Sequence, residues 1–224
     1  MAGAERPRLA ITLGDPAGIG PEVVLKSLMH NDVYAAAEPL VIGDRRVLER
    51  TVAALGLPLA IQPVANVREA TFSPGTVTVL DLENADPATF AVGEESAVAG
   101  GAAVDYVFRA CDLAMAGEVD AIVTAPLNKA AMHLAGYTYA GHTELLTERT
   151  NAPRVSMLLI GPGLRIVHVS THVALSEAIA RVTPQRVEEV IQLAHDACRS
   201  LGIAEPRIAV AGLNPHASEG GIFG

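Results

Sequence analysis

Short aliphatic runs alternate along this chain with longer segments in which apolar residues recur every three or four positions. The short runs are continuous rather than alternating, which is typical of strands that are covered on both faces. They predict strands over residues 8–13, 39–42, 76–80, 121–124, 155–160, 164–169 and 207–211. The longer segments predict helices over residues 21–29, 45–55, 95–115, 128–134, 143–150 and 183–201. Strands and helices in alternation predict an α/β fold with a largely parallel sheet.

A hinge is predicted at residues 124–129, where a strand ends at Pro126 and the helical pattern restarts. A break at this point would divide the chain into two α/β lobes with a cleft between them. The first lobe would hold residues 1–128, and the second would hold residues 129–224.

Composition narrows the class of protein. Half of the 224 residues are hydrophobic and only 4% are aromatic, so the core must be aliphatic. The net charge is −9 and no run of Lys and Arg exceeds two residues, which argues against nucleic acid or anionic membrane as a partner. No apolar run approaches the roughly 18 residues of a membrane span, and the N-terminus lacks the apolar region of a signal peptide. Cys111 and Cys198 have no CxxC partner, so they predict reduced core thiols and a cytoplasmic protein.

A glycine-rich loop, residues 14–22, joins the first predicted strand to the first predicted helix. Glycine lets the backbone turn tightly and approach a ligand, and the free N–H groups at the helix start favour an anion. The spacing is not GxGxxG, so the loop does not by itself indicate a Rossmann dinucleotide site. The alternative is a tight turn in which Asp15 caps backbone donors.

Three histidines stand where predicted elements begin or end. His142 stands just outside the start of a helix that Thr143 could cap, where an imidazole, a hydroxyl and free amides could bind a carboxylate or phosphate; ordinary capping with a solvated histidine is the alternative. His172 and His216 each follow a predicted strand, and ligands of parallel α/β folds bind at the carboxyl ends of strands. The three could therefore converge on one cleft, and neutral imidazoles suit Zn²⁺ or a similar divalent ion.

The other candidates have simpler interpretations. His168 lies inside a predicted strand and is expected to be a satisfied core histidine, while His30, His133 and His195 fall on helical faces. Lys129 is by default an exposed lysine, although beside the hinge it would supply positive charge at the mouth of a cleft.

The chain resembles the 4-hydroxythreonine-4-phosphate dehydrogenase family in five segments that keep the family's order and spacing: residues 12–22, 124–129, 141–144, 171–172 and 212–217. The resemblance implies a fold like that of isocitrate and isopropylmalate dehydrogenases, with two α/β/α lobes, a central cleft and a homodimer. It also implies an oxidoreductase of pyridoxine biosynthesis that uses NAD or NADP and a divalent metal (Zn, Mg, Mn or Co). The implied reaction oxidises a small anionic substrate, 4-phosphohydroxy-L-threonine or a related phosphorylated 3-hydroxy acid, and decarboxylates the β-keto product.

Carried over by position, His142 and Thr143 would contact substrate, and His172 and His216 would bind the metal. Lys129 is the candidate for orienting the substrate's carboxylate or phosphate. The family's third metal histidine lies further along, as do a lysine, an asparagine and an arginine that hold substrate. The C-terminal part of the fold is therefore expected to be absent from the given chain.

One departure leaves the substrate open. Members of the vitamin B6 pathway usually read His-Ala-Gly-Glu-Gly-Gly-His after the Asn-Pro pair, whereas this chain has Ser218 and Ile222 at the variable places. Relatives that oxidise phosphorylated four-carbon acids or a terephthalate-type cis-dihydrodiol are similar overall. A metal-dependent acyl- or phosphotransferase on the same fold, or a binding fragment without activity, are the alternatives outside this class.

Overall fold

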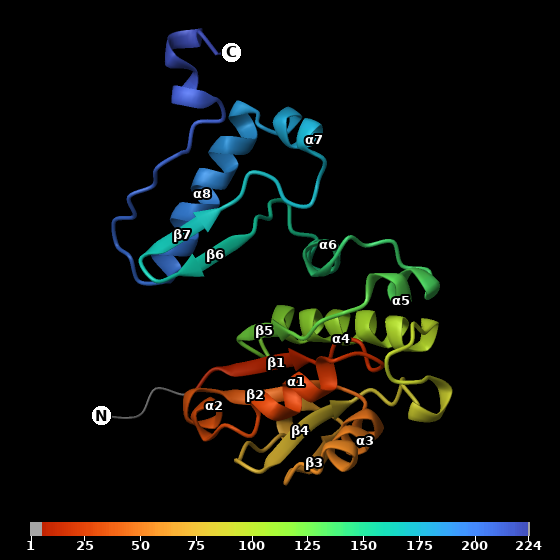
Figure 1. Ribbon diagram of the computed structural model, residues 1–224. Coiled ribbons are helices and arrows are strands. Elements are labelled where there is room, and N and C mark those ends of the chain that lie inside the picture. Colours follow the sequence, from red (N-terminus) through yellow and green to blue (C-terminus); the bar gives the residue numbers. More distant parts are fainter. Residues whose placement is uncertain (1–5, 224) are drawn as a thin grey trace, which may run out of the picture. The chain divides into compact units, whose positions relative to one another are not determined.

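Residues 6–223 are described by a computed structural model, and they fall into two units (Figure 1). The first unit ends at Ala152 and the second begins at Pro153. The first unit extends past the predicted hinge because two further helices, α5 (Lys129–Leu134) and α6 (His142–Thr150), pack against α4 (Ala97–Met115). The division into lobes at residues 128 and 129 stays a prediction for the whole protein.

A five-stranded parallel sheet forms the centre of the first unit, as the continuous aliphatic runs predict. Its strands lie in the order β3-β4-β2-β1-β5, and every paired neighbour is parallel. Their bounds are Arg8–Thr12 for β1, Glu38–Gly43 for β2, Ala60–Val64 for β3, Thr76–Asp81 for β4 and Ala121–Thr124 for β5. The central strand β2 is fully covered at Leu40, Val41 and Ile42, whereas β5 is an edge strand with most of its residues exposed. The expectation of strands covered on both faces is therefore wrong for β5.

Helices α1 (Gly20–Ser27), α2 (Asn31–Ala36) and α3 (Arg45–Leu55) follow the first two strands. Local signals fix α3 well: Asp44 accepts a hydrogen bond from the Arg46 amide at 2.9 Å at its start, and Gly56 ends it in the left-handed conformation. The strand β3 and the helix α2 are not predicted by the hydrophobic pattern, because both are short and rich in polar residues or interrupted by Pro63.

The direction of the chain reverses within this sheet (Figure 1). The connections from β1 to β2 and from β2 to β3 run toward one edge, while α4 leads from β4 past β1 to β5 at the other edge. Because parallel crossovers are right-handed, this reversal places α4 on the face opposite to α1 and α3. The helices that follow β1 and β5 consequently lie on opposite faces, since α1 packs against α3 and α5 packs against α4. This switch point is where open α/β sheets bind ligands.

The second unit differs from the parallel arrangement predicted for it. Strands β6 (Leu158–Gly161) and β7 (Leu164–Val167) form an antiparallel hairpin, which Pro162 and Gly163 close tightly. Helix α7 (Leu175–Ala180), helix α8 (Pro184–Ser200) and a short 3₁₀ segment, η3 (Pro215–Gly221), follow. The aliphatic side chains of the hairpin are largely exposed, contrary to expectation; they include Leu159, Ile160, Leu164 and Ile166.

Residues 207–211 do not form the predicted strand. They follow an extended path without a ladder partner, and an apolar groove of about 640 Å³ separates them from β7 and α8. Among the described residues, no helix combines the length and apolarity that crossing a membrane requires. Cys111 is buried and Cys198 half-buried, and both thiols are free, as predicted.

Candidate active site at the sheet switch point

The glycine-rich loop after β1 is docked against the loop after β5. Gly14 has a φ of +70°, and the Asp15 amide donates to the Pro126 carbonyl at 2.9 Å. A Cβ atom on Gly14 would stand 2.3 Å from that carbonyl oxygen, so no larger residue fits. Gly20, which opens α1, stands beside Ala125 of the same loop. The two loops thus form one continuous floor at the switch point.

Asp15 caps this loop from within. Its Oδ1 accepts a hydrogen bond from the Ala17 amide at 2.8 Å, and the residue is only 3% exposed. Burial raises the pKa of the Asp15 carboxyl, and the Ala17 amide acts against that rise. The capping interpretation of Asp15 is therefore confirmed. The free amides that could face a ligand are those of α1, since Ile19 provides its start without any side-chain cap.

Arg50 of α3 holds the outer side of the glycine loop. Its guanidinium donates to the carbonyls of Pro16 and Pro87, each at 3.3 Å, and lies over the Phe90 ring. The Gly93 amide donates to the Ala17 carbonyl at 2.8 Å. These contacts tie the loop to the segment that precedes α4, which fixes its shape without using the groups that face the switch point.

His142 reaches the same floor from the start of α6. The backbone of Ala125 lies beside its ring, and its Nε2 atom is buried without a hydrogen-bond partner. Burial lowers the pKa of His142, and the neighbouring Ala125 backbone only partly offsets this effect. The Nε2 atom of a neutral imidazole can therefore accept or donate one hydrogen bond to a ligand, according to the tautomer.

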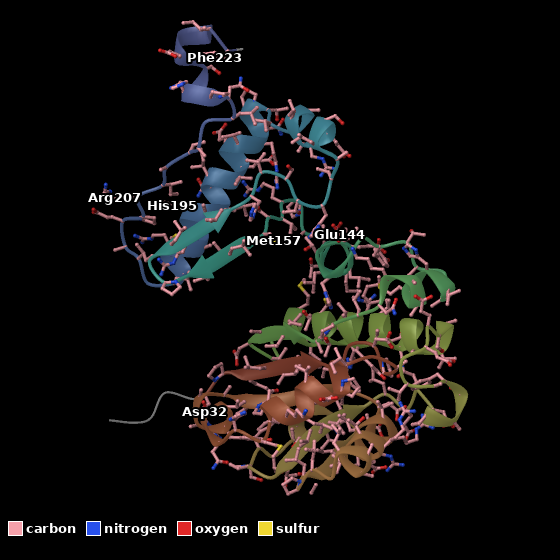
Figure 2. All side chains as sticks on the ribbon, in the orientation of Figure 1. Asp32, Glu144, Met157, His195, Arg207 and Phe223 are labelled. Atoms are coloured by element: carbon pink, nitrogen blue, oxygen red, sulfur yellow. The ribbon has the colours of Figure 1, made fainter. Side chains whose placement is uncertain are left out.

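The start of α6 is less free for an anion than the sequence suggests. Gly141 provides no side-chain cap, but the Glu144 carboxylate in the first turn (Figure 2) folds back to within 3.8 Å of the Cβ position at Gly141. This carboxylate competes with an anionic ligand for the helix amides. Thr143 is half-buried beside His142. The sequence alone did not single out Glu144 or the Ala125 carbonyl as parts of this site.

Lys129 is the first residue of α5 and is exposed. The helix starts at Asn128, whose Oδ1 accepts from the Ala131 amide at 3.1 Å. Lys129 directly follows the floor residues, so its backbone lies near the site. Among the described contacts, none involves its side chain.

The two predicted metal ligands lie in the second unit. His172 is exposed and has a left-handed φ of +56°, five residues after the end of β7. His216 lies in η3, also left-handed with a φ of +54°, and its ring stacks on that of Phe223 with 5.9 Å between the ring centroids. His216 therefore does not follow a strand, because residues 207–211 find no partner to form one. His168 is half-buried and its Nδ1 has no partner, so the prediction of a satisfied core histidine is wrong.

These histidines are of the residue type that binds a divalent metal, but they are too few to complete a metal site. Imidazoles are ligands that Zn²⁺ and similar ions accept, and a protein site usually supplies three or four donors. Within the described part of the chain, no group of three or more His, Cys, Asp or Glu side chains is arranged to hold an ion. The described residues by themselves do not make a complete metal site.

Comparisons with known proteins agree with the resemblance in the sequence. Residues 35–224 match the family described as pyridoxal phosphate biosynthetic protein PdxA. A D-threonate 4-phosphate dehydrogenase of Cupriavidus necator is 47% identical over 97% of this chain and 65% of its own length. The chain therefore spans slightly less than two thirds of that curated relative.

Solved structures show the same likeness in three dimensions. A 4-hydroxythreonine-4-phosphate dehydrogenase from Burkholderia phymatum matches with a TM-score of 0.88 and 45% identity, over 99% of this chain and 67% of the other. A terephthalate 1,2-cis-dihydrodiol dehydrogenase from Burkholderia xenovorans matches less closely, with a TM-score of 0.68 and 33% identity, over 98% of this chain and 66% of the other. The chain belongs to the PdxA family of pyridoxal phosphate biosynthetic proteins.

Proposed function

We propose that the whole protein is an NAD(P)- and divalent-metal-dependent dehydrogenase of a phosphorylated 3-hydroxy acid, and that it releases CO₂ from the β-keto product. The observation that carries the proposal is the buried, unpartnered Nε2 atom of His142 beside the Ala125 carbonyl at the switch point. A buried acceptor without a donor is costly unless a ligand completes it. The hydroxyl of a substrate is a donor of the required kind.

Two features of the first unit support an anionic, hydroxylated substrate. The uncapped start of α1 offers free amides next to Ala125, on the same floor that the His142 ring contacts. The Nε2 lone pair of neutral His142 would accept the hydrogen bond of the alcohol, and Thr143 would contact the substrate beside it. Lys129 would then offset the charge of the carboxylate or phosphate.

The relatives' names favour a phosphorylated four-carbon acid. The Cupriavidus relative is named for D-threonate 4-phosphate, and the Burkholderia phymatum structure for 4-hydroxythreonine-4-phosphate. Both compounds carry an anionic phosphate and a hydroxyl β to a carboxylate. D-threonate 4-phosphate is the first candidate for this chain because that relative is the more similar of the two; the terephthalate-type diol is the competing candidate.

The proposed cofactors, a nicotinamide and a divalent ion, would supply the redox and electrophilic chemistry. When bound, the nicotinamide accepts the hydride, and the divalent ion withdraws electron density from the oxidised oxygen, which favours loss of CO₂ from the β-keto acid. We propose that His172 and His216 supply two donors for that ion, with the others contributed from outside the described residues. A cytoplasmic homodimer is part of the same proposal.

Three variants test the assignment of residues in the full-length protein: His142→Ala, Thr143→Ala and His216→Ala. The first two are expected to raise KM for substrate by about tenfold or more, since each removes a contact of the kind worth roughly 1–3 kcal/mol. His216→Ala is expected to lose metal and turnover together. The measurements are steady-state kinetics and metal content of the purified proteins.

The opposite pattern would overturn the assignment. Loss of metal from the His142 variant, with metal retained in the His216 variant, would exchange the roles of the two residues. His133→Ala is the matched control, because His133 is exposed on α5 and is given no part in binding.

A further inference from the structure

The segment after β7 carries His172 but has little regular structure of its own. Beyond Val167 the backbone has no strand or helix assignment until α7 begins at Leu175. Two local bonds extend the hairpin slightly: the His168 amide donates to the Met157 carbonyl at 3.2 Å, and the Ser156 hydroxyl donates to the His168 carbonyl. These bonds end at His168, so another contact has to fix the backbone at Val169, the next residue toward His172.

Arg186, in the first turn of α8, supplies this contact. Its Nε donates to the Val169 carbonyl at 3.1 Å, and its Nη2 donates to the Val155 carbonyl at 2.9 Å. The guanidinium therefore bridges the two chain segments that continue from the hairpin, at the point where their own ladder has ended. Glu189, one turn along α8, pairs with Arg186 Nη1 at 3.5 Å and holds the guanidinium in place.

The geometry requires arginine rather than a generic cation. The two carbonyls belong to different segments, and a planar fork with donors in fixed directions reaches both at once. The ammonium of lysine is a point charge at the end of a flexible stem, so it would not hold both carbonyls in this arrangement. The Arg186 side chain is 26% exposed, and the bonds are therefore shielded from much of the competing water.

We infer that Arg186 is a positioning residue for His172: its guanidinium fixes the end of the β7 extension and thereby sets where the imidazole is presented. The inference rests on the proposed role of His172 as a metal ligand. Partners that orient a ligand without touching the metal commonly change metal affinity by about 10- to 100-fold when they are removed. A residue that only supported the fold would not change metal affinity in a protein that stays folded.

The test compares Arg186→Gln with Arg181→Gln in the full-length protein. Both substitutions remove one positive charge from the second unit, and Arg181 forms an exposed ion pair with Glu177 at the end of α7. Two quantities are measured for each: hydrogen exchange at the His168 amide and at the amides of α8, and the affinity for cobalt(II) alone by visible absorption. We expect Arg186→Gln to speed exchange at His168, leave α8 protected, and weaken cobalt(II) binding about tenfold or more. Arg181→Gln should leave exchange at His168, protection of α8 and cobalt(II) affinity as they are in the wild type.

Arg186→Lys and His172→Ala make the outcome decisive. If Arg186→Gln exposes the amides of α8, the comparison rests on the lysine variant, which keeps the charge. Cobalt(II) binding by Arg186→Lys that equals the wild type would overturn the inference, as would equal effects of Arg186→Gln and Arg181→Gln. Unchanged cobalt(II) binding by His172→Ala would instead overturn the proposal that His172 is a metal ligand. Hydrogen exchange at the His168 amide would still test whether Arg186 fixes the end of the β7 extension.

Discussion

At the scale of single residues, the environment of His142 decides what its imidazole can do. The residue is half-buried, the Ala125 backbone lies beside its ring, and its Nε2 atom is buried without a hydrogen-bond partner. Burial holds the pKa of His142 below its usual value, so the ring is neutral at physiological pH. A neutral ring can accept a hydrogen bond at Nε2, which a protonated ring cannot do.

This lowered pKa predicts a specific dependence of stability on pH. Above about pH 6.5 the ring is neutral in both the folded and unfolded states and contributes nothing. As the pH falls below about 6.5, the unfolded chain binds a proton that the folded protein resists, so the free energy of unfolding falls. His142→Asn cannot be protonated, and its stability relative to the wild type should therefore improve between about pH 7 and pH 5.

Urea unfolding at several pH values measures this difference, with His133→Asn as the control at an exposed position of α5. The account expects the improvement in the His142 variant and its absence in the control. A stability difference between the His142 variant and the wild type that does not change with pH would mean that the ring is not desolvated.

At the scale of elements, local signals in the sequence are enough for the helices and strands that carry their own boundaries. Helix α3 has the predicted bounds because Asp44 and Gly56 mark its ends. The direction of β6 and β7 is not encoded in their aliphatic runs, and residues 207–211 show that such a run needs a partner before it becomes a strand.

The candidate site likewise has parts that the sequence predicts and parts that depend on the fold. The glycine loop and the start of α6 were predictable because glycines, prolines and a histidine mark them directly in the sequence. The buried Nε2 atom of His142 was not predictable, since only the fold brings the segment of Ala125 next to the start of α6. The fold likewise decides that Glu144 shares the helix start, and that the bridge from Arg186 ends next to the segment of His172.

Neighbouring glycines in α4 provide a test of how that helix positions α5. A Cβ atom at Gly100 would lie 2.1 Å from the Ala131 carbonyl oxygen, whereas one at Gly101 would meet Ala135 at an ordinary 3.6 Å. Gly100→Ala should therefore lower the free energy of unfolding by roughly 1–3 kcal/mol, the usual cost of overpacking. Gly101→Ala should be neutral or gain up to about 1 kcal/mol, because alanine favours helix.

Urea unfolding of the two variants gives both values, and each variant serves as the other's control for helix propensity. Equal effects of the two substitutions would contradict the close approach of α4 and α5.

At the scale of the whole molecule, each of the two units contains its own group of candidate residues. The first unit contains a parallel sheet with a switch point, and the second contains the exposed residues His172 and His216, which lie outside its strands and α-helices. The likeness to a D-threonate 4-phosphate dehydrogenase covers 97% of the chain, so both units belong to that comparison. The central claim is that the whole protein oxidises a phosphorylated 3-hydroxy acid.

The most direct test supplies the full-length protein with a divalent ion, NAD⁺ or NADP⁺, and one substrate at a time: D-threonate 4-phosphate, 4-phosphohydroxy-L-threonine, 4-phospho-D-erythronate or the terephthalate cis-dihydrodiol. Nicotinamide reduction and CO₂ release are followed together. The account predicts reduction with a phosphorylated four-carbon acid, D-threonate 4-phosphate first, and CO₂ in equal amount. A clear preference for the diol would contradict the substrate assignment. No nicotinamide reduction with any of the four, with metal confirmed in the protein, would contradict the dehydrogenase itself.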